Sequence, residues 1–139
     1  MRVMVMIRAT EANEAGELPT AEMMKGMGNY NEELVKAGIM LTGDGMKPSS
    51  AGKRVRFDGS SRMVIDGPFP TRETVAGFWL WEVKDMAEAV DWLKRCPNPM
   101  PTASEVEIRP FYQIEDLADV MTPELSAQEK RLREMERDD

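Results

Sequence analysis

The chain has 139 residues, of which 42% are hydrophobic and 31% charged, and its 25 acidic and 18 basic residues give a net charge of −7. This length suits one compact domain and leaves no room for a second domain of ordinary size. The net negative charge excludes strong electrostatic binding to phosphate backbones or anionic headgroups. We therefore expect no nucleic-acid and no membrane partner.

The sequence contains no histidine, and Cys96 is its only cysteine. Within one chain this excludes Ser-His-Asp and Cys-His nucleophiles, histidine-ligated zinc or iron, and a histidine general base. A single cysteine forms no internal disulfide and no metal-binding cluster. We predict no cofactor and no metal site, although a metal held only by oxygen ligands stays open. Proton transfer would depend on carboxylate, Lys or Tyr chemistry.

The first half of the chain reads as strand, helix, strand and hairpin. Residues 2–8 alternate as a strand does and are too few for a signal peptide or membrane span, so we expect a cytoplasmic protein. Helical spacing of apolar residues predicts a helix over 20–37 that ends at Gly38. Residues 39–42 read as a short strand. Residues 53–57 and 62–65 flank Asp58-Gly59 and predict a hairpin inserted at the sheet margin.

The second half predicts two more core strands and one helix. In residues 76–83, Phe78 and Leu80 alternate with three apolar residues of the opposite face, so we expect both faces of this strand to be buried. Asp85 begins a helix that Pro97 ends, and residues 105–110 alternate as the last strand. The order predicts an α+β, ferredoxin-like split βαβ fold with a hairpin insertion.

Two helices on one face leave the other face of the sheet uncovered. Met4, Met6 and one side of the 76–83 strand would form an exposed apolar patch that requires cover. A second copy of the same sheet is the simplest cover. We therefore predict a homodimer in which two sheets form a dimeric α+β barrel.

A block of adjacent motifs resembles a known family. Residues 66–69 read Asp-Gly-Pro-Phe, followed by Thr-Arg-Glu at 71–73 and Gly-Phe-Trp-Leu-Trp-Glu-Val at 77–83. Together with further blocks up to residue 112, this order is similar to the DGPF proteins of the YCII-related family. The resemblance divides the chain into a YCII-related domain at 1–112 and a helical tail at 113–139.

The resemblance implies a dimeric α+β barrel with a cleft beside the Asp-Gly-Pro-Phe loop, in a family whose members mostly have no assigned reaction. One related member processes chlorohydroxyquinol, which implies that a lyase step is possible on this scaffold. The histidine that pairs with an aspartate in other YCII-related proteins has no counterpart here.

Asp66 and Asp44 are the candidate catalytic residues. Gly67 and Pro68 would hold Asp66 at a turn, where it either caps its own loop or acts as a base, and the capping role is the more common one. Asp44, between two glycines, has the same two interpretations. If the two carboxylates meet across a cleft, one pKa should rise.

The candidate substrate-binding residues are Arg8, Phe69, Glu82, Glu107 and Arg109. Arginines inside a barrel could hold a substrate carboxylate with two hydrogen bonds. They could equally form a structural ion pair with Glu82, which we expect to be buried and to require such a partner.

These observations favour a protein that binds a small organic molecule, with acid/base lyase or isomerase activity as the enzymatic hypothesis. The alternative is a non-catalytic interaction or regulatory dimer module. The tail should form a helix from Thr122, either solvated or packed on the partner subunit.

Overall fold

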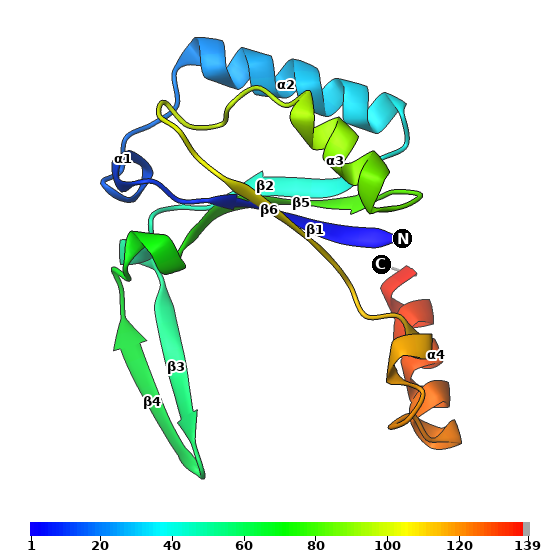
Figure 1. Ribbon diagram of the computed structural model, residues 1–139. Helices are drawn as coiled ribbons and strands as arrows, with labels where there is room; N and C mark the ends of the chain where they lie inside the picture. Colours follow the sequence, from blue (N-terminus) through cyan, green and yellow to red (C-terminus); the bar gives the residue numbers. More distant parts are fainter. Residues whose placement is uncertain (138–139) are drawn as a thin grey trace.

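The computed structural model describes residues 1–137 and is built on one four-stranded antiparallel sheet with the order β2-β5-β1-β6 (Figure 1). The strands are β1 (Arg2–Arg8), β2 (Met40–Gly45), β5 (Val75–Glu82) and β6 (Val106–Pro110). Helix α2 (Ala21–Lys36) connects β1 to β2, and helix α3 (Met86–Lys94) connects β5 to β6. The predicted α+β class is confirmed, and the strand order is that of a split βαβ plan.

Local signals in the sequence account for where the two helices begin and end. The Thr20 side chain accepts a hydrogen bond from the Met23 N–H at 3.1 Å, and Asp85 accepts one from the Glu88 N–H at 2.9 Å. Both are N-caps, which satisfy free amides of the first turn. Gly38 follows α2 with φ +74°, a conformation that glycine adopts without a Cβ clash.

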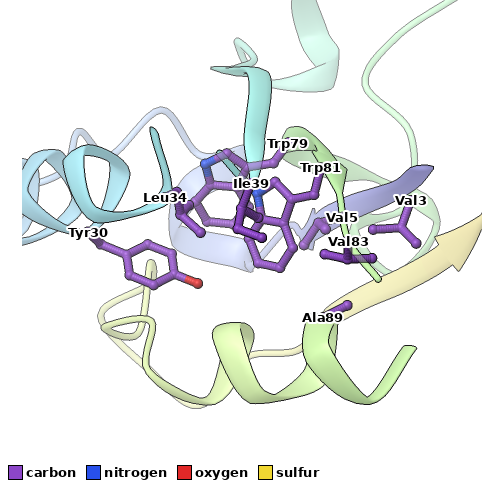
Figure 2. Packing of buried hydrophobic residues seen from close by; sticks show 9 residues of the cluster. All are labelled: Val3, Val5, Tyr30, Leu34, Ile39, Trp79, Trp81, Val83 and Ala89. Carbon is purple, nitrogen blue, oxygen red and sulfur yellow. The ribbon is translucent and has the colours of Figure 1, made fainter. Parts of the chain in front are cut away.

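The hydrophobic core lies between the two helices and one face of the sheet (Figure 2). Trp81, Leu34, Val3 and Val5 are its largest fully buried side chains. The Trp79 Nε1–H donates to Asn31 Oδ1 at 2.9 Å, which satisfies a polar group that would otherwise be costly to bury. Alternate residues of β1 and β5 thus point to this face of the sheet and pack against the two helices.

The opposite face of the sheet has no helix over it among the described residues (Figure 1). Its apolar residues lie opposite each other in the β1–β5 register, Met4 with Leu80 and Met6 with Phe78, and all four are only half-buried. The prediction that both faces of β5 are buried was therefore right for the Trp79 and Trp81 face and wrong for the Phe78 and Leu80 face in a single chain. We call this surface the uncovered face.

The inserted hairpin is a separate two-stranded sheet of β3 (Lys53–Asp58) and β4 (Ser61–Asp66) that projects from the body on the side of the uncovered face (Figure 1). All twelve strand residues are exposed. Gly59 adopts φ +58° in the connecting turn, which confirms the predicted hairpin and its glycine turn. We call residues 53–66 the arm.

The tail forms α4 (Pro123–Arg137), which projects to the same side of the sheet as the arm (Figure 1). Its start at Thr122 was predicted, and the Thr122 Oγ1 accepts from the Leu125 N–H at 3.1 Å. The sequence did not predict four short elements: α1 (Glu11–Glu14), η1 (Ser49–Ala51), η2 (Thr71–Glu73) and η3 (Ile114–Leu117). Within residues 1–137, no helix has the length and apolarity needed to cross a bilayer.

Candidate functional site

The Asp-Gly-Pro-Phe loop is clamped to the segment that follows β2. A Cβ on Gly67 would stand 1.9 Å from the backbone oxygen of Ser49, so only glycine fits this close approach. The Phe69 N–H donates to Ser49 Oγ at 2.9 Å, and the Ser49 N–H donates to the Glu14 carboxylate at 2.7 Å. The Ser49 hydroxyl also bonds Glu14. The loop, η1 and α1 are therefore joined through one serine.

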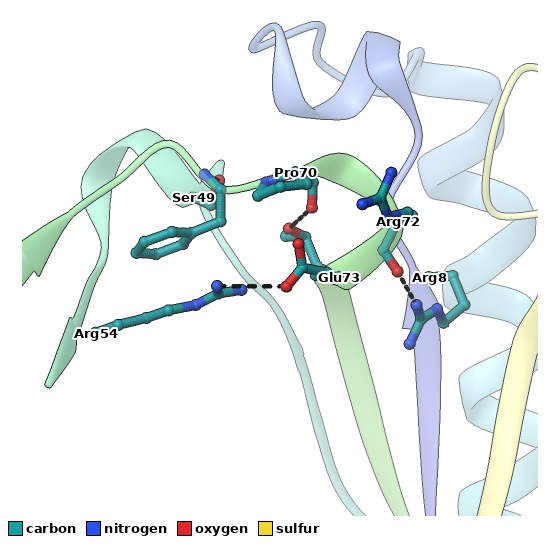
Figure 3. A network of polar contacts seen from close by, with 8 residues as sticks. Arg8, Ser49, Arg54, Pro70, Arg72 and Glu73 are labelled. Atoms are coloured by element: carbon teal, nitrogen blue, oxygen red, sulfur yellow. Dashed lines mark hydrogen bonds and ion pairs between the residues drawn. The ribbon is translucent and has the colours of Figure 1, made fainter. Parts of the chain in front are cut away.

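Phe69 anchors the base of the arm and lines neither of the two cavities described below. The Arg54 guanidinium lies 3.9 Å from the Phe69 ring centroid and 3.6 Å from a Glu73 carboxylate oxygen. The neighbouring Arg72 backbone oxygen accepts a hydrogen bond from Arg8, which ties η2 to the end of β1 (Figure 3). These contacts fix the direction in which the arm leaves the body.

Asp66 lies at the end of β4, where its carboxylate pairs with Lys53 across the base of the arm. Its side chain is 75% exposed. An exposed ion pair of this kind contributes little to stability. Asp66 lines neither of the two cavities described below, so the structure does not bring it together with Asp44.

A cavity of about 480 Å³ lies between the segment from α1 to α2, the paired ends of β2 and β5, and residues 99–101. We call it the methionine cavity, because its lining includes Met23, Met24, Met27, Met46 and Met100. The volume lies within the range of small-molecule sites. Thioether side chains adapt to ligands of different shapes, which suits a binding surface.

A few polar groups interrupt this apolar lining. Asp44 and Glu17 border the methionine cavity, and no Lys or Arg is among its lining residues. Asn13 also lines it, and its Oδ1 is buried without a hydrogen-bond partner among the described residues. A ligand that brings a donor would satisfy this acceptor once the Asn13 side chain turns its Oδ1 toward the cavity. The acidic lining disfavours anions and suits neutral or cationic molecules.

The predicted arginine sites lie on the uncovered face, outside the methionine cavity. The Arg8 guanidinium is 4.0 Å from Glu107, and Arg109 is 3.8 Å from the same carboxylate. Glu107 and Arg109 both occupy β6, paired in register with Met6 and Met4. The structure therefore brings these three residues together as one charged cluster beside the apolar patch.

The expected partner of Glu82 was wrong. Its carboxylate accepts from the Met1 ammonium at 3.3 Å, and its side chain is 51% exposed rather than buried. It lies at the end of β5, opposite Arg2 in the β1 register, where the strand leaves the sheet and water reaches the carboxylate. No buried arginine partner is required for a carboxylate in this position.

A second, more open groove of about 660 Å³ runs between α3 and β6. Cys96 lines it, and burial raises the pKa of its thiol to about 11. A thiol with a raised pKa forms little thiolate at neutral pH, so Cys96 is a poor nucleophile. Within the described part of the chain, no group of three or more Cys, Asp or Glu side chains could hold a metal ion.

The sequence did not point to the residues that make the methionine cavity. Met23 and Met27 belong to the apolar repeat that predicts α2, and both also line the cavity wall. Asn13 belongs to α1, a four-residue helix that carries no hydrophobic period. The one available signal was the high methionine content, 13 of 139 residues, of which five line this cavity.

The model of the YCII-related domain matches residues 1–112, most of the chain. The chain belongs to this family. An uncharacterised protein of Rhizobium meliloti (strain 1021) is 28% identical over 90 residues, which cover 64% of this chain and 73% of that protein. The name of this relative states no reaction, so the comparison brings none to this chain.

Proposed function

We propose that this YCII-related protein binds a small aromatic molecule that carries a hydrogen-bond donor, in the methionine cavity. The observation that carries the proposal is the buried Asn13 Oδ1, without a partner among the described residues, in a lining that is otherwise largely apolar. An aromatic ring fits methionine thioethers well, and a donor on the ring would satisfy the acceptor. The acidic border favours neutral over anionic ligands.

Methionine methyl NMR tests this proposal directly, with phenol and toluene as probes. Binding should shift the methyl signals of Met23, Met27 and Met100, while Met4 and Met6 on the uncovered face serve as internal references. Phenol should bind about tenfold more tightly than toluene, because one buried hydrogen bond is worth about 1–1.5 kcal/mol. Shifts at Met4 and Met6 alone would place the site elsewhere.

The variant Asn13→Leu separates the hydrogen bond from the shape of the cavity. Leucine keeps the branched heavy-atom skeleton of asparagine without its polar atoms, so toluene binding should persist while the preference for phenol is lost. Asn29→Leu is the matched control, because Asn29 is exposed on α2 and does not line the methionine cavity. Equal phenol preference in the wild-type protein and in Asn13→Leu would show that Asn13 is not the recognition group.

For the enzymatic hypothesis, Asp44 is the better placed of the two candidate carboxylates. It borders the methionine cavity, whereas Asp66 is exposed and paired with Lys53. We propose acid/base lyase or isomerase chemistry with Asp44 as the base. Asp44→Asn should then abolish turnover of an identified substrate and Asp66→Asn should not, so the reverse result would return the role to Asp66.

We also propose that the protein forms a homodimer through the uncovered face. The half-buried patch of Met4, Met6, Phe78 and Leu80 supports this second role, because a soluble monomer seldom leaves such a patch on the open side of a sheet. Two sheets face to face would enclose the Arg8, Glu107 and Arg109 cluster and could recognise an anion there.

Sedimentation equilibrium tests the homodimer. The wild-type protein should sediment as a dimer at micromolar concentration, and Leu80→Asp should sediment as a monomer because a buried, unpaired carboxylate opposes association. Val35→Asp is the control, since Val35 is 60% exposed on α2, which covers the other face of the sheet. A monomeric wild-type protein would contradict the proposal.

A further inference from the structure

The arm and α4 share an unusual property, since neither packs extensively against another element within residues 1–137. β3 and β4 pair only with each other, and the arm exposes Phe57 by 71% and Val64 by 61%. Along α4, Leu132 and Met135 are 47% and 64% exposed. A lone hairpin and a lightly packed helix of this length are both marginal in water. Both elements therefore need a surface that the single chain does not supply.

The two elements leave opposite ends of the sheet toward the same side. The arm is inserted between β2 and β5, where β1 ends, while α4 follows β6 at the end where β1 begins, since Val3 lies opposite Pro110. Figure 1 shows both projecting beyond the uncovered face, one at each end. A body placed against that face would therefore lie between them.

In the proposed homodimer, on which this inference rests, that body is a second copy. A face-to-face dimer has a two-fold axis in the plane between the sheets. Such an axis brings each end of one sheet over either the same end or the opposite end of the other sheet. The arm of one copy would then meet either the partner's arm or the partner's α4.

Charge decides between these two arrangements. The arm has four basic and two acidic residues and a net charge of +2, whereas residues 113–137 have seven acidic and four basic residues and a net charge of −3. Arm against arm, or tail against tail, would bring like charges together, while arm against tail pairs opposite charges. We infer that the arm of each copy docks on α4 of the partner, with Phe57 and Val64 against the stripe of Leu132 and Met135.

Disulfide trapping in the full-length protein tests this clasp. Both variants would carry Cys96→Ser. One chain would carry Phe57→Cys and the other Leu132→Cys, and the two chains would be co-expressed and oxidised together. The mixed pair should form covalent dimers in severalfold higher yield than either chain alone. Val35→Cys is the matched control, because Val35 is 60% exposed on α2, away from the arm and tail.

The outcomes separate the clasp from the dimer. Severalfold excess of the Phe57→Cys with Leu132→Cys product supports the clasp. The clasp would be overturned if the protein sediments as a dimer but the covalent yield does not exceed that of Val35→Cys mixed with Leu132→Cys. It would also be overturned if Phe57→Cys is joined mainly to itself. Either result would leave the homodimer proposal intact. A wild-type monomer at all concentrations would overturn both.

A double-mutant cycle gives a second readout that does not depend on disulfide chemistry. Phe57→Ala and Leu132→Ala should each raise the dimer dissociation constant, and the double variant should be no weaker than the worse single variant, because the two side chains bury each other. Independent, additive effects would contradict a direct arm-to-tail contact. Higher salt should weaken the wild-type dimer through the same opposite charges.

Discussion

The two sides of the sheet follow different physical rules, although the same strands supply both. On the helix side, Trp81 and Leu34 are fully buried, and they belong to the hydrophobic core between the sheet and the helices. On the uncovered side, Leu80 and Phe78 come from the same strand as Trp81 and remain half-buried. One chain therefore completes one layer of its fold and leaves the other for an association.

The comparison also explains where the polar groups lie. On the helix side, Trp79 has an asparagine partner, and the Tyr30 hydroxyl donates to the Trp92 backbone oxygen at 2.6 Å. On the uncovered side, Arg8, Glu107 and Arg109 pair loosely at 3.8–4.0 Å. Loose pairs near water are worth little, and the same pairs become stronger when a partner surface excludes water.

The largest expected effect comes from matched leucine truncations on the two sides. Leu34→Ala should lower the free energy of unfolding by about 3 kcal/mol, because it leaves a cavity in a closed core. Leu80→Ala should cost about 1 kcal/mol in the monomer, since the side chain is only half-buried. Chemical denaturation at low protein concentration measures both.

Raising the protein concentration should sharpen the same comparison. Leu80→Ala should then lose more stability relative to the wild type, because dimer formation adds to the stability of the wild-type protein by mass action. Leu34→Ala should show the same deficit at every concentration. If both variants lose the same unfolding free energy at every protein concentration, then the uncovered side is not stabilised by association.

The base of the arm gives the next largest effect, because it belongs to the uncovered side yet is tightly fitted. Gly67→Ala should destabilise the protein by about 2 kcal/mol, since its Cβ would meet backbone atoms of Ser49 that cannot rotate away. Gly28→Ala within α2 is the matched control: its Cβ would meet nothing within 4 Å, and alanine should add about 0.5–1 kcal/mol of stability. Thermal unfolding of both variants is the measurement.

A mild cost for Gly67→Ala would show that the Asp-Gly-Pro-Phe loop can move away from Ser49. The arm should then change direction, and disulfide trapping between Phe57→Cys and Leu132→Cys should decline with it. If Gly67→Ala is strongly destabilised but trapping stays complete, then the fit of the loop against Ser49 does not set the direction of the arm.

Much of the helix side could be predicted from the sequence, and little of the cavity could. Periodicity and caps located α2, α3 and the core strands, because burial imposes a repeating pattern on a chain. The methionine cavity depends on α1 and on residues 99–101, which have no period and are positioned by tertiary contacts such as Thr10 with Met100. Asp66 was identified as a motif residue, but its exposure depends on where the arm points, and no local pattern encodes that direction.

The smallest predicted effect is an alkaline loss of stability that reports on the helix side alone. Burial raises the pKa of Cys96 to about 11 from an ordinary value near 9, and burial also raises the pKa of Tyr30 above its ordinary value of 10. Above pH 9 the unfolded chain releases the Cys96 proton while the folded chain keeps it, so stability should fall as pH rises from about 9 to 11, and Tyr30 should add to the fall above pH 10. Because the Cys96 side chain is partly exposed, its share of the loss should be on the order of 1 kcal/mol.

Two variants assign this loss to its sources. Cys96→Ala should flatten the decline between pH 9 and 11, and Tyr30→Phe should flatten the part above pH 10, although losing the hydroxyl bond to Trp92 lowers stability at every pH. Tyr112→Phe is the matched control, because Tyr112 is 78% exposed. Melting temperatures measured from pH 7 to 11 supply the slopes. An unchanged slope in Cys96→Ala would show that the alkaline sensitivity does not come from burial of this thiol.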